Sequence, residues 1–339
     1  MPVAAASYNG GIMSRQDAKT IYEFFGIEER KHAVQLVKHF DEVPDSKKRY
    51  PLMAQVKKDG IFAAVAIVGY TATIFGRTGK RLSNVELQEQ DFFQVMFERT
   101  LPEIPQGVFI AELCSKDCSL EVLSGIVNPN RNKPLTDEQK KIKENMYLCF
   151  HDYVTVSEFV MGHSELPYIK REERLLKFIP ERQVLRSYLC YDEKDVTDFA
   201  DLCIKHGEEG AVFKDIAAGW DAGHKGWHAT KIVRGVEYDL ECIGYEEGKG
   251  KYAGKVANLL FRFRDGETIK AMLGRGWTHE DARNMYIDLQ AACEAFNGEA
   301  PGPVGRIYRV TALQESSTGK KLRLPKVGEE RHDKEQPDF

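Results

Sequence analysis

The stretch from residue 236 to residue 324 restricts the fold of this 339-residue chain more than any other part of its sequence. Two strands joined by a loop of Gly and Lys are expected over 236–264, and a third strand over 267–273. A helix is expected over 278–296 and a closing hairpin over 305–324. Strand, loop, strand, strand, helix, strand, strand within about 100 residues is the order of a small Greek-key barrel of the OB type.

The residues before this barrel mix helical and strand patterns. Apolar residues at helical spacing, beginning with Ile21, Phe24 and Phe25, predict a helix over 14–43. Short apolar runs broken by Gly and by charged residues predict strands. The further elements expected are strands over 51–56, 61–76, 107–114, 146–160 and 210–216, and helices over 135–146, 171–179 and 195–207. We therefore expect an α+β fold with two domains, at residues 1–233 and 234–339.

Charge and cysteine content limit the class of protein. The chain has 48 Lys+Arg and 52 Asp+Glu, a formal net charge of −4 that argues against a generic polycation and, taken alone, against DNA as a partner. Its seven cysteines are scattered without a zinc-binding pattern, which favours reduced cysteines in a cytoplasmic protein. Because no apolar run approaches roughly 20 residues and no secretory signal is recognised, no membrane partner is expected.

The first motif that carries chemistry is the tetrapeptide Lys57-Lys58-Asp59-Gly60, which lies between two apolar strands. A lysine at a strand end can act as a covalent nucleophile once it has lost its proton. For an ordinary lysine, the neutral form at pH 7 costs about 4.6 kcal/mol. Burial, the neighbouring Lys58 or a metal ion would lower that cost. Taken alone, the tetrapeptide is more typical of a solvated turn.

Later segments carry side chains that fit the same chemistry. Arg77 lies in a Gly-flexed segment suited to phosphate or ribose contact. Glu112 lies within an apolar strand, where an unpaired carboxylate is costly, so a cation is its natural partner. Glu209 precedes a strand that contains Lys214, and Lys231 lies on a further short strand. Each is more typical of a surface charge when taken alone. Together they offer lysines for phosphates and two carboxylates for a divalent metal.

The residues from Lys249 to Arg264 concentrate positive charge that the near-neutral total conceals. The segment reads KGKYAGKVANLLFRFR and has five basic residues and no acidic one. Phosphate backbones are bound by such local concentrations of Lys and Arg. The alternative is a solvated loop of a Gly/Lys hairpin. The candidate DNA-binding residues are Lys249, Lys251, Lys255, Arg262 and Arg264.

In this order and at this spacing, the motifs resemble those of the covalent nucleotidyltransferases, and most closely the compact ATP-dependent DNA ligases of bacteriophage type. The matching segments are Lys57-x-Asp59-Gly60 (motif I), Arg77-x-Gly79 (Ia), Glu112 (III), 147–153 (IIIa), 209–214 (IV), Lys231 (V) and 322–326 through 331–334 (VI). The segment 269–277, followed by Asp281-Ala282-Arg283, resembles the OB domain of the same family. The resemblance covers 49–334 and implies an ATP-grasp-like adenylation domain of antiparallel sheets and helices, followed by an OB-fold barrel.

The resemblance also implies a role for each matching position. Lys57, with Asp59 beside it, would attack the α-phosphorus of ATP, and AMP would then pass to the 5′-phosphate at a nick. Gln55 would read the adenine edge, and either Phe150 or His151 would stack on the adenine. The other residues implied to bind the nucleotide are Arg77, Glu112, Lys214, Lys231, Arg323, Arg331 and Lys334.

The carboxylates of the set are implied to bind metal, and three positions depart from the family pattern. Glu112 and Glu209 would hold Mg²⁺ or Mn²⁺. Phe62 stands where an arginine is usual, which puts one contact near the nick in doubt. Motif III has Ala111 before its glutamate where Gly is common. Val233 stands where a second motif V lysine is usual, and Arg234 is the candidate substitute.

The expectation that follows is an ATP-dependent DNA ligase that seals 5′-phosphate/3′-OH nicks in duplex DNA, as a monomer in the cytoplasm, or in the host cytoplasm if it is virus-encoded. An RNA ligase or an mRNA-capping-type nucleotidyltransferase shares the lysine chemistry, but the OB pattern and the ending Arg323-x-Pro325 favour the DNA ligase. A non-catalytic OB-fold nucleic-acid binder is a more distant alternative, because it leaves the first 230 or so residues unexplained.

Overall fold

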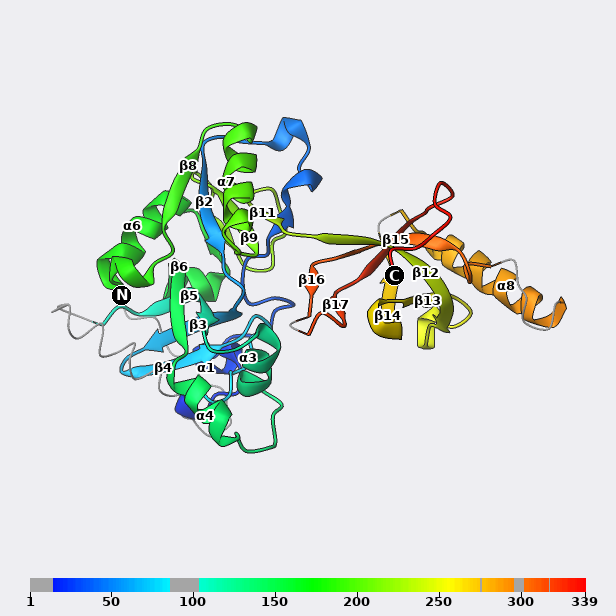
Figure 1. Cartoon of the computed structure of the whole chain (residues 1–339). Coiled ribbons are helices and arrows are strands. Elements are labelled where there is room, and N and C mark those ends of the chain that lie inside the picture. Colours follow the sequence, from blue (N-terminus) through cyan, green and yellow to red (C-terminus); the bar gives the residue numbers. More distant parts are fainter. Residues whose placement is uncertain (1–14, 86–103, 275, 296–301, 317) are drawn as a thin grey trace. The chain divides into compact units, whose positions relative to one another are not determined.

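The computed structural model describes residues 15–85, 104–274, 276–295, 302–316 and 318–339 (Figure 1). The chain divides into two compact units, Met1–Val233 and Arg234–Phe339, which are described separately below. The α+β class is confirmed, because the first unit combines sheets with helices and the second contains a closed barrel.

The first unit contains a five-stranded sheet in the order β1-β11-β9-β2-β8. Its strands are β1 (Lys38–His39), β2 (Leu52–Lys57), β8 (Ser187–Cys190), β9 (Gly210–Asp215) and β11 (Ala229–Val233). All neighbours are antiparallel except β1 and β11, which run parallel. Helix α7 (Glu193–Lys205) packs on one face of this sheet through a core that includes Ala54, Val196 and Phe213. The opposite face carries the candidate site.

A four-stranded antiparallel sheet in the order β4-β3-β5-β6 lies beside it (Figure 1). Its strands are β3 (Ile61–Val68), β4 (Thr71–Phe75), β5 (Gly107–Cys114) and β6 (Tyr147–Thr155). Alternate residues of β3 enter two different cores, with Ala63 and Val65 in one and Ala64 and Ala66 in the other. Because both faces are covered, β3 is a continuous apolar run rather than an alternating one.

The link between the two sheets places the candidate nucleophile. Strand β2 ends at Lys57 in the five-stranded sheet, and β3 begins at Ile61 in the four-stranded sheet. The chain therefore passes from one sheet to the other within Lys58, Asp59 and Gly60. A lysine at this point lies where the two sheets meet.

The helix expected over 14–43 is wrong for most of its length. The α-helix of this segment is α1 (Ile21–Phe25), which Thr20 begins with a capping box and Gly26 ends in the left-handed conformation at φ 65°. Further along, Ala33 and Val34 are buried in the same core as Phe24 without forming a helix. Packing against that core therefore accounts for their apolar character. The short 3₁₀ helices of the region are Arg15–Asp17, Phe40–Glu42 and Asp45–Lys47.

The strand expected over 146–160 ends earlier than predicted. Strand β6 stops at Thr155, whose side chain caps helix α5 (Val156–Met161) in a capping box with Glu158. The sequence Thr-Val-Ser-Glu is the signature of such a start, and the strand prediction passed over it. Among the described residues, the other α-helices of this unit are α3 (Leu120–Val127), α4 (Asp137–Glu144) and α6 (Tyr168–Phe178). Strand β7 (His163–Ser164) pairs with β10 (Trp220–Asp221).

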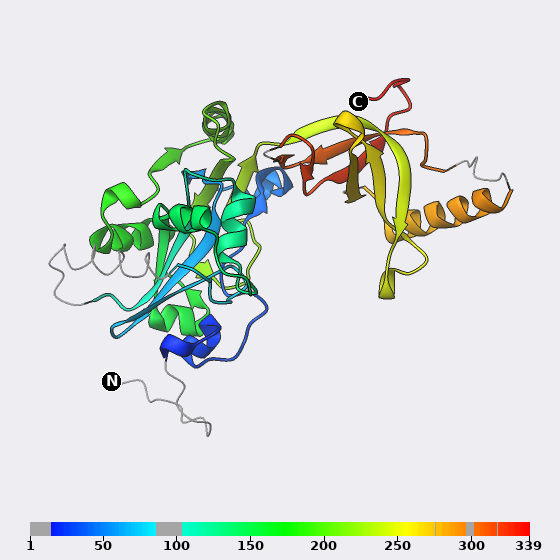
Figure 2. The same ribbon diagram turned by 60° about the horizontal axis from the view of Figure 1, so that its bottom comes forward.

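The second unit is built on a closed five-stranded barrel in the order β12-β13-β14-β18-β15, which confirms the expected barrel (Figure 2). Its strands are β12 (Val236–Glu247), β13 (Val256–Arg262), β14 (Thr268–Leu273), β15 (Ile307–Ala312) and β18 (Lys326–Glu330). β14 and β18 run parallel, and the other pairs are antiparallel. Leu240, Phe261 and Val310 are among the fully buried side chains of its core.

Helix α8 (His279–Ala295) connects β14 to β15, as expected from the sequence. The closing hairpin was expected to end at 324, but the last barrel strand is β18, which begins at Lys326. Within the expected hairpin, a separate two-stranded ribbon forms from β16 (Gln314–Glu315) and β17 (Leu322–Arg323). Arg275 of the quoted OB pattern lies outside the described residues. Within the described ranges, no helix is long and apolar enough to cross a membrane.

Candidate functional site

Lys57 is placed by the pairing of β2 with β9. It lies opposite Gly210, and its Nζ is 2.6 Å from Oε2 of Glu209, the residue immediately before β9. The Lys57 side chain is 21% exposed and that of Glu209 only 7%. Gly210 has a φ of +147°, and a Cβ there would lie 2.1 Å from the carbonyl oxygen of Ile232, so glycine permits the close approach of β11.

The loop after Lys57 packs tightly against the end of β5. A Cβ at Gly60 would lie 2.9 Å from both Sγ of Cys114 and the carbonyl oxygen of Leu113. This close approach brings the loop beside Glu112, which lies opposite Phe62 on β3. Burial raises the pKa of Glu112 to about 7, although Lys57 acts to lower it. The sequence interpretation placed a carboxylate in the apolar run of β5, and the structure brings it next to the charge of Lys57.

Three cations and three carboxylates meet here. The carboxylate of Glu112 lies within range of the charges of Lys57, Glu209, Arg77 and Asp59. Burial lowers the pKa of Lys231, and the positive charges of Lys57 and Arg77 lower it further. Motifs I, Ia, III, IV and V, which are far apart in the sequence, therefore converge on one place in the first unit.

A row of directly paired residues crosses the five-stranded sheet through this site. Ser187 pairs with Gln55, Gln55 with Val212, Val212 with Lys231, and Lys231 with His39. Because paired residues of neighbouring strands share a face, this row and Lys57, two residues beyond Gln55, lie on the same side of the sheet. His39 was missed by sequence reasoning, because it lies on a two-residue strand within a segment expected to be helical.

Of the two candidates for stacking on a base, the structure favours His151 over Phe150. The Phe150 side chain is 1% exposed and packs in a core with Phe109, their ring centroids 6.3 Å apart. His151 is half-buried, and its Nδ1 lies 3.2 Å from Nζ of Lys214, on the strand next to β2. The assignment of Phe150 to the base is therefore corrected: its ring is a core side chain. Burial lowers the pKa of His151 to about 3, so the ring is neutral.

Lys214 lies away from the expected phosphate site. It is four residues along β9 from Gly210, the partner of Lys57. Its Nζ donates to the carbonyl oxygen of His151 at 3.0 Å and lies 4.2 Å from the ring centroid of Tyr168. Burial lowers the pKa of Lys214 to about 8. These contacts place Lys214 beside the candidate base-stacking residue rather than beside Lys57.

A buried ion pair supports this end of the site, and sequence reasoning missed it. Arg171 of α6 donates to both carboxylate oxygens of Asp152, at 2.9 and 3.0 Å, and the two side chains are 2% and 5% exposed. Burial acts to raise the pKa of Asp152, but Arg171 and then Lys214 outweigh it and the pKa is lowered. The sequence did offer a sign of this ion pair, because Asp152 is a carboxylate within the largely apolar strand β6. The same kind of pattern identified Glu112 on β5.

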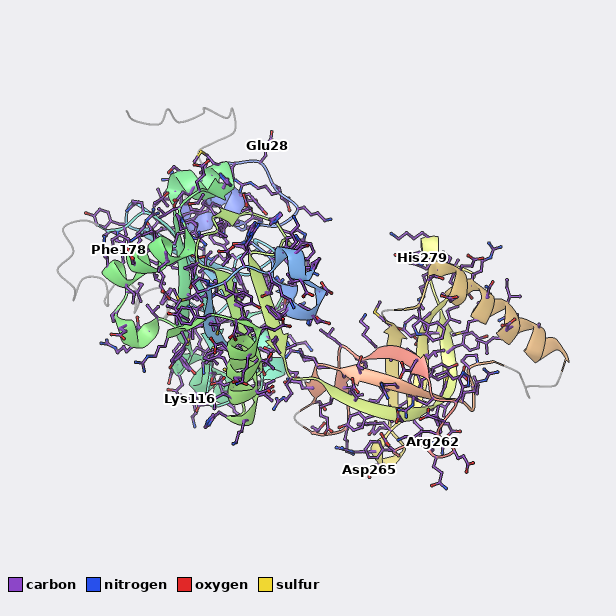
Figure 3. The ribbon with its side chains drawn as sticks, turned by 90° about the horizontal axis from the view of Figure 1, so that it is seen from above. Glu28, Lys116, Phe178, Arg262, Asp265 and His279 are labelled. Atoms are coloured by element: carbon purple, nitrogen blue, oxygen red, sulfur yellow. The ribbon has the colours of Figure 1, made fainter. Side chains whose placement is uncertain are left out.

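The candidate DNA-binding residues all lie in the second unit. Lys249 and Lys251 are exposed in the loop between β12 and β13, and Lys255 is half-buried. Arg262, labelled in Figure 3 at the end of β13, lies 3.3 Å from a carboxylate oxygen of Glu241. Acidic residues of the neighbouring strand therefore offset part of the charge that the segment concentrates.

Arg264 has a structural environment of its own. Its Nη1 donates to Glu315 at 2.7 Å, and its guanidinium lies 4.8 Å from the ring centroid of Phe339 and 5.4 Å from that of Phe263. A guanidinium held by a carboxylate and aromatic rings is less available to a phosphate. The turn that follows contains Asp265, also labelled in Figure 3.

The cations of the C-terminal motif are paired within the second unit. Nη1 of Arg331 lies 2.8 and 2.7 Å from the two carboxylate oxygens of Asp239, and Nζ of Lys334 lies 2.8 Å from the same carboxylate. Arg331 also donates to Asp333 at 2.9 and 2.7 Å. Arg323 is half-buried on β17.

Comparisons with known proteins identify the family to which the chain is related. A family profile described as "ATP dependent DNA ligase domain" matches residues 33–232, and one described as "DNA ligase OB-like domain" matches 247–331. A DNA ligase of Nitrosopumilus maritimus is 30% identical over 256 residues, which are 69% of this chain and 41% of the relative. A probable DNA ligase of Streptomyces griseus is 29% identical over 132 residues, or 37% of this chain and 25% of the relative. The chain thus spans less than half the length of these curated relatives.

Two solved structures share the fold. One, titled as a structure–function study of Lig E DNA ligases, has a TM-score of 0.61 at 16% identity and covers 88% of this chain and 98% of its own. Another, titled Pmar-Lig_PreS3, has a TM-score of 0.71 at 17% identity and covers 88% of this chain and 67% of its own. With the profile match over more than half of its length, the chain belongs to the ATP-dependent DNA ligase family.

Proposed function

We propose that this chain is an ATP-dependent DNA ligase that seals 5′-phosphate/3′-OH nicks in duplex DNA. The observation that carries the proposal is the position of Lys57 at the junction of two sheets, 2.6 Å from Glu209 and within range of Glu112, Arg77 and Lys231. In-line phosphoryl transfer depends mainly on positioning and on stabilising phosphoryl charge, and this set of side chains is suited to both.

The reaction takes three steps. Nζ of Lys57, after losing a proton, attacks the α-phosphorus of ATP; the new N–P bond replaces the bond to pyrophosphate, which leaves. The 5′-phosphate at the nick then attacks the same phosphorus, which breaks the N–P bond and restores the lysine. Finally, the 3′-OH loses its proton and attacks the phosphorus of the adenylylated 5′-phosphate. The new O–P bond replaces the bond to AMP, which leaves. We assign Asp59 to the loop that holds the nucleophile, and Arg77 and Lys231 to the phosphates.

Glu112 and Glu209 fit a divalent cation. Mg²⁺ is usually held by one or two carboxylates together with substrate phosphates, and the charges of these two carboxylates act on each other at the site. Within the described ranges, no group of three or more His, Cys, Asp or Glu side chains is arranged to hold a metal ion by itself. When bound, Mg²⁺ or Mn²⁺ would neutralise developing negative charge on the phosphates.

The remaining assignments complete the proposal. Residues 1–233 form the adenylation domain, and 234–339 form the OB domain. Gln55 reads the adenine edge and His151 stacks on the ring. Arg323, Arg331 and Lys334 bind the triphosphate in the first step, while Lys249, Lys251, Lys255 and Arg262 bind DNA. The enzyme acts as a monomer in the cytoplasm.

The experiment that tests the proposal is a sealing assay with the full-length protein on nicked DNA, nicked RNA and hybrid duplexes. We expect sealing of nicked DNA with ATP and Mg²⁺, and none with GTP or NAD⁺. Preferential sealing of RNA would favour the RNA ligase alternative. Nucleic-acid binding without any covalent nucleotide transfer would leave the non-catalytic OB-fold binder.

A further inference from the structure

A chain of hydrogen bonds runs behind Gln55, away from Lys57. Nε2 of Gln55 donates to Oγ of Ser187 at 2.9 Å and to the carbonyl oxygen of Leu185 at 3.3 Å. The hydroxyl of Ser187 donates in turn to the carboxylate of Glu172 on α6. Gln55 is only 2% exposed, so its amide is held within the protein. None of these partners was singled out from the sequence.

The direction of these bonds fixes which way the amide of Gln55 faces. A backbone carbonyl can only accept, so the amide atom that faces Leu185 is the nitrogen. An amide nitrogen has two hydrogens, and both are used by Leu185 and Ser187. Among the residues that the structure describes, none donates to Oε1 of Gln55, and this oxygen is not one of the fully enclosed, unpaired atoms. Gln55 therefore offers a carbonyl oxygen to a ligand.

Glu172 sets the polarity of this chain. A hydroxyl has one hydrogen, and a carboxylate accepts but does not donate when ionised. Because the hydroxyl of Ser187 gives its hydrogen to Glu172, its oxygen must be the acceptor in the hydrogen bond with Gln55. Without Glu172, the hydroxyl could turn and donate to Oε1 of a reversed amide. The carboxylate therefore adds, through Ser187, a second constraint to that of the Leu185 carbonyl, and together they hold the donor side of Gln55 inward.

An outward carbonyl oxygen distinguishes between purines at C6. Adenine carries an amino group there, which donates, whereas hypoxanthine and guanine carry a carbonyl, which accepts. Two facing acceptors repel, and a buried polar group left unpaired is costly. We propose that Ser187 and Glu172 are positioning residues that hold the amide of Gln55 in this orientation. They thereby set the preference of the nucleotidyl transfer to Lys57 for ATP over purine nucleotides with a carbonyl at C6. This inference rests on the proposed function.

The test compares covalent nucleotidylation of the full-length protein by α-labelled ATP and α-labelled inosine triphosphate, which differ at C6. For the wild type, kcat/KM should favour ATP on the order of 100-fold or more. In Ser187→Ala the preference should fall about tenfold, mainly through a higher KM for ATP, equivalent to about 1.4 kcal/mol of discrimination. Ser187→Thr keeps the hydroxyl on a strand that tolerates Thr, so it should restore the preference. Glu172→Gln should give a smaller fall, because its amide can both accept and donate.

The outcomes separate this inference from the proposed function. A wild type that takes no label from ATP overturns the proposed function and this inference with it. A labelled wild type whose ATP preference is unchanged in both Ser187→Ala and Glu172→Gln overturns the inference alone. An equal loss of both labels in Ser187→Ala and Ser187→Thr would indicate a structural role for the strand and would also contradict it. Circular dichroism establishes that each variant is folded.

Discussion

The two units hold their candidate phosphate-binding cations in different ways. In the first unit, Arg77 and Lys231 have neither a hydrogen bond nor an ion pair with a side chain among the residues described. In the second unit, Arg331 and Lys334 share the carboxylate of Asp239. If both sets bind phosphate as proposed, the first can do so directly, whereas the second must first give up a protein carboxylate. Four changes test or sharpen this comparison.

The largest effect should come from the nucleophile. We expect Lys57→Ala to abolish covalent labelling by α-labelled ATP, because the other amine of the site, that of Lys231, lies on β11 and is assigned to the phosphates. Lys58→Ala is the matched control, since the adjacent amine pairs with Glu208 instead. It should retain labelling within several-fold. Equal loss in both variants would contradict the assignment of Lys57 and indicate a general disturbance of the loop.

The next effect should come from the carboxylate beside the nucleophile. Glu209→Gln keeps the shape of the side chain but removes its charge, so labelling should fall on the order of 100-fold or more with Mg²⁺ present. Glu208→Gln serves as the neighbouring control and should have a much smaller effect. Sealing and labelling that remain at the wild-type rate in Glu209→Gln would remove Glu209 from the proposed metal site.

A stability measurement compares ion pairs between the units. Arg171→Met leaves the Asp152 carboxylate buried without its partner, so guanidinium unfolding should show a loss of about 3–5 kcal/mol. The double variant Asp152→Leu/Arg171→Met should recover much of that loss, since neither charge remains. Arg331→Met leaves Asp239 paired with Lys334, so it should change the unfolding free energy far less. Similar losses in both single variants would contradict the contrast.

The smallest effect is a pH dependence in the second unit. Burial acts to raise the pKa of Asp239, but Lys334 and Arg331 outweigh it and the pKa is lowered. A lowered folded-state pKa contributes stability above the unfolded-state pKa of about 3.9, and that contribution disappears as pH falls through the folded-state value. The stability difference between wild type and Asp239→Asn should therefore be present at pH 7 and shrink below about pH 4. If the stability difference between wild type and Asp239→Asn grew as the pH fell, the pairing of Asp239 with Arg331 and Lys334 would be excluded.

The strands and the candidate nucleophile could be predicted because their causes are local. The apolar run of β3 and the lysine before it are visible in a short window of sequence. The prediction of a helix over 14–43 was wrong because Ala33 and Val34 are apolar where they pack into a core with residues far away in the sequence. Periodicity within one segment does not reveal which partner will cover it.

The sequence left two candidates for the base-stacking residue, Phe150 and His151, for a different reason. The register between β5 and β6 shifts at a bulge, where Phe150 pairs with Ala111 and Asp152 with the adjacent Ile110. His151 is the extra residue between them, so simple alternation along β6 does not place its side chain. The network of Ser187 and Glu172 was equally hidden, because its members come from three separate elements. Tertiary pairing, not local pattern, brings them to Gln55.

The measurement that tests the central claim most directly is mass spectrometry of the intact protein and its peptides after incubation with ATP and Mg²⁺. We predict one added AMP, located on Nζ of Lys57, and its disappearance when nicked DNA is added and sealed. An adduct on another residue, or an adduct on Lys57 that nicked DNA does not remove, would contradict the account.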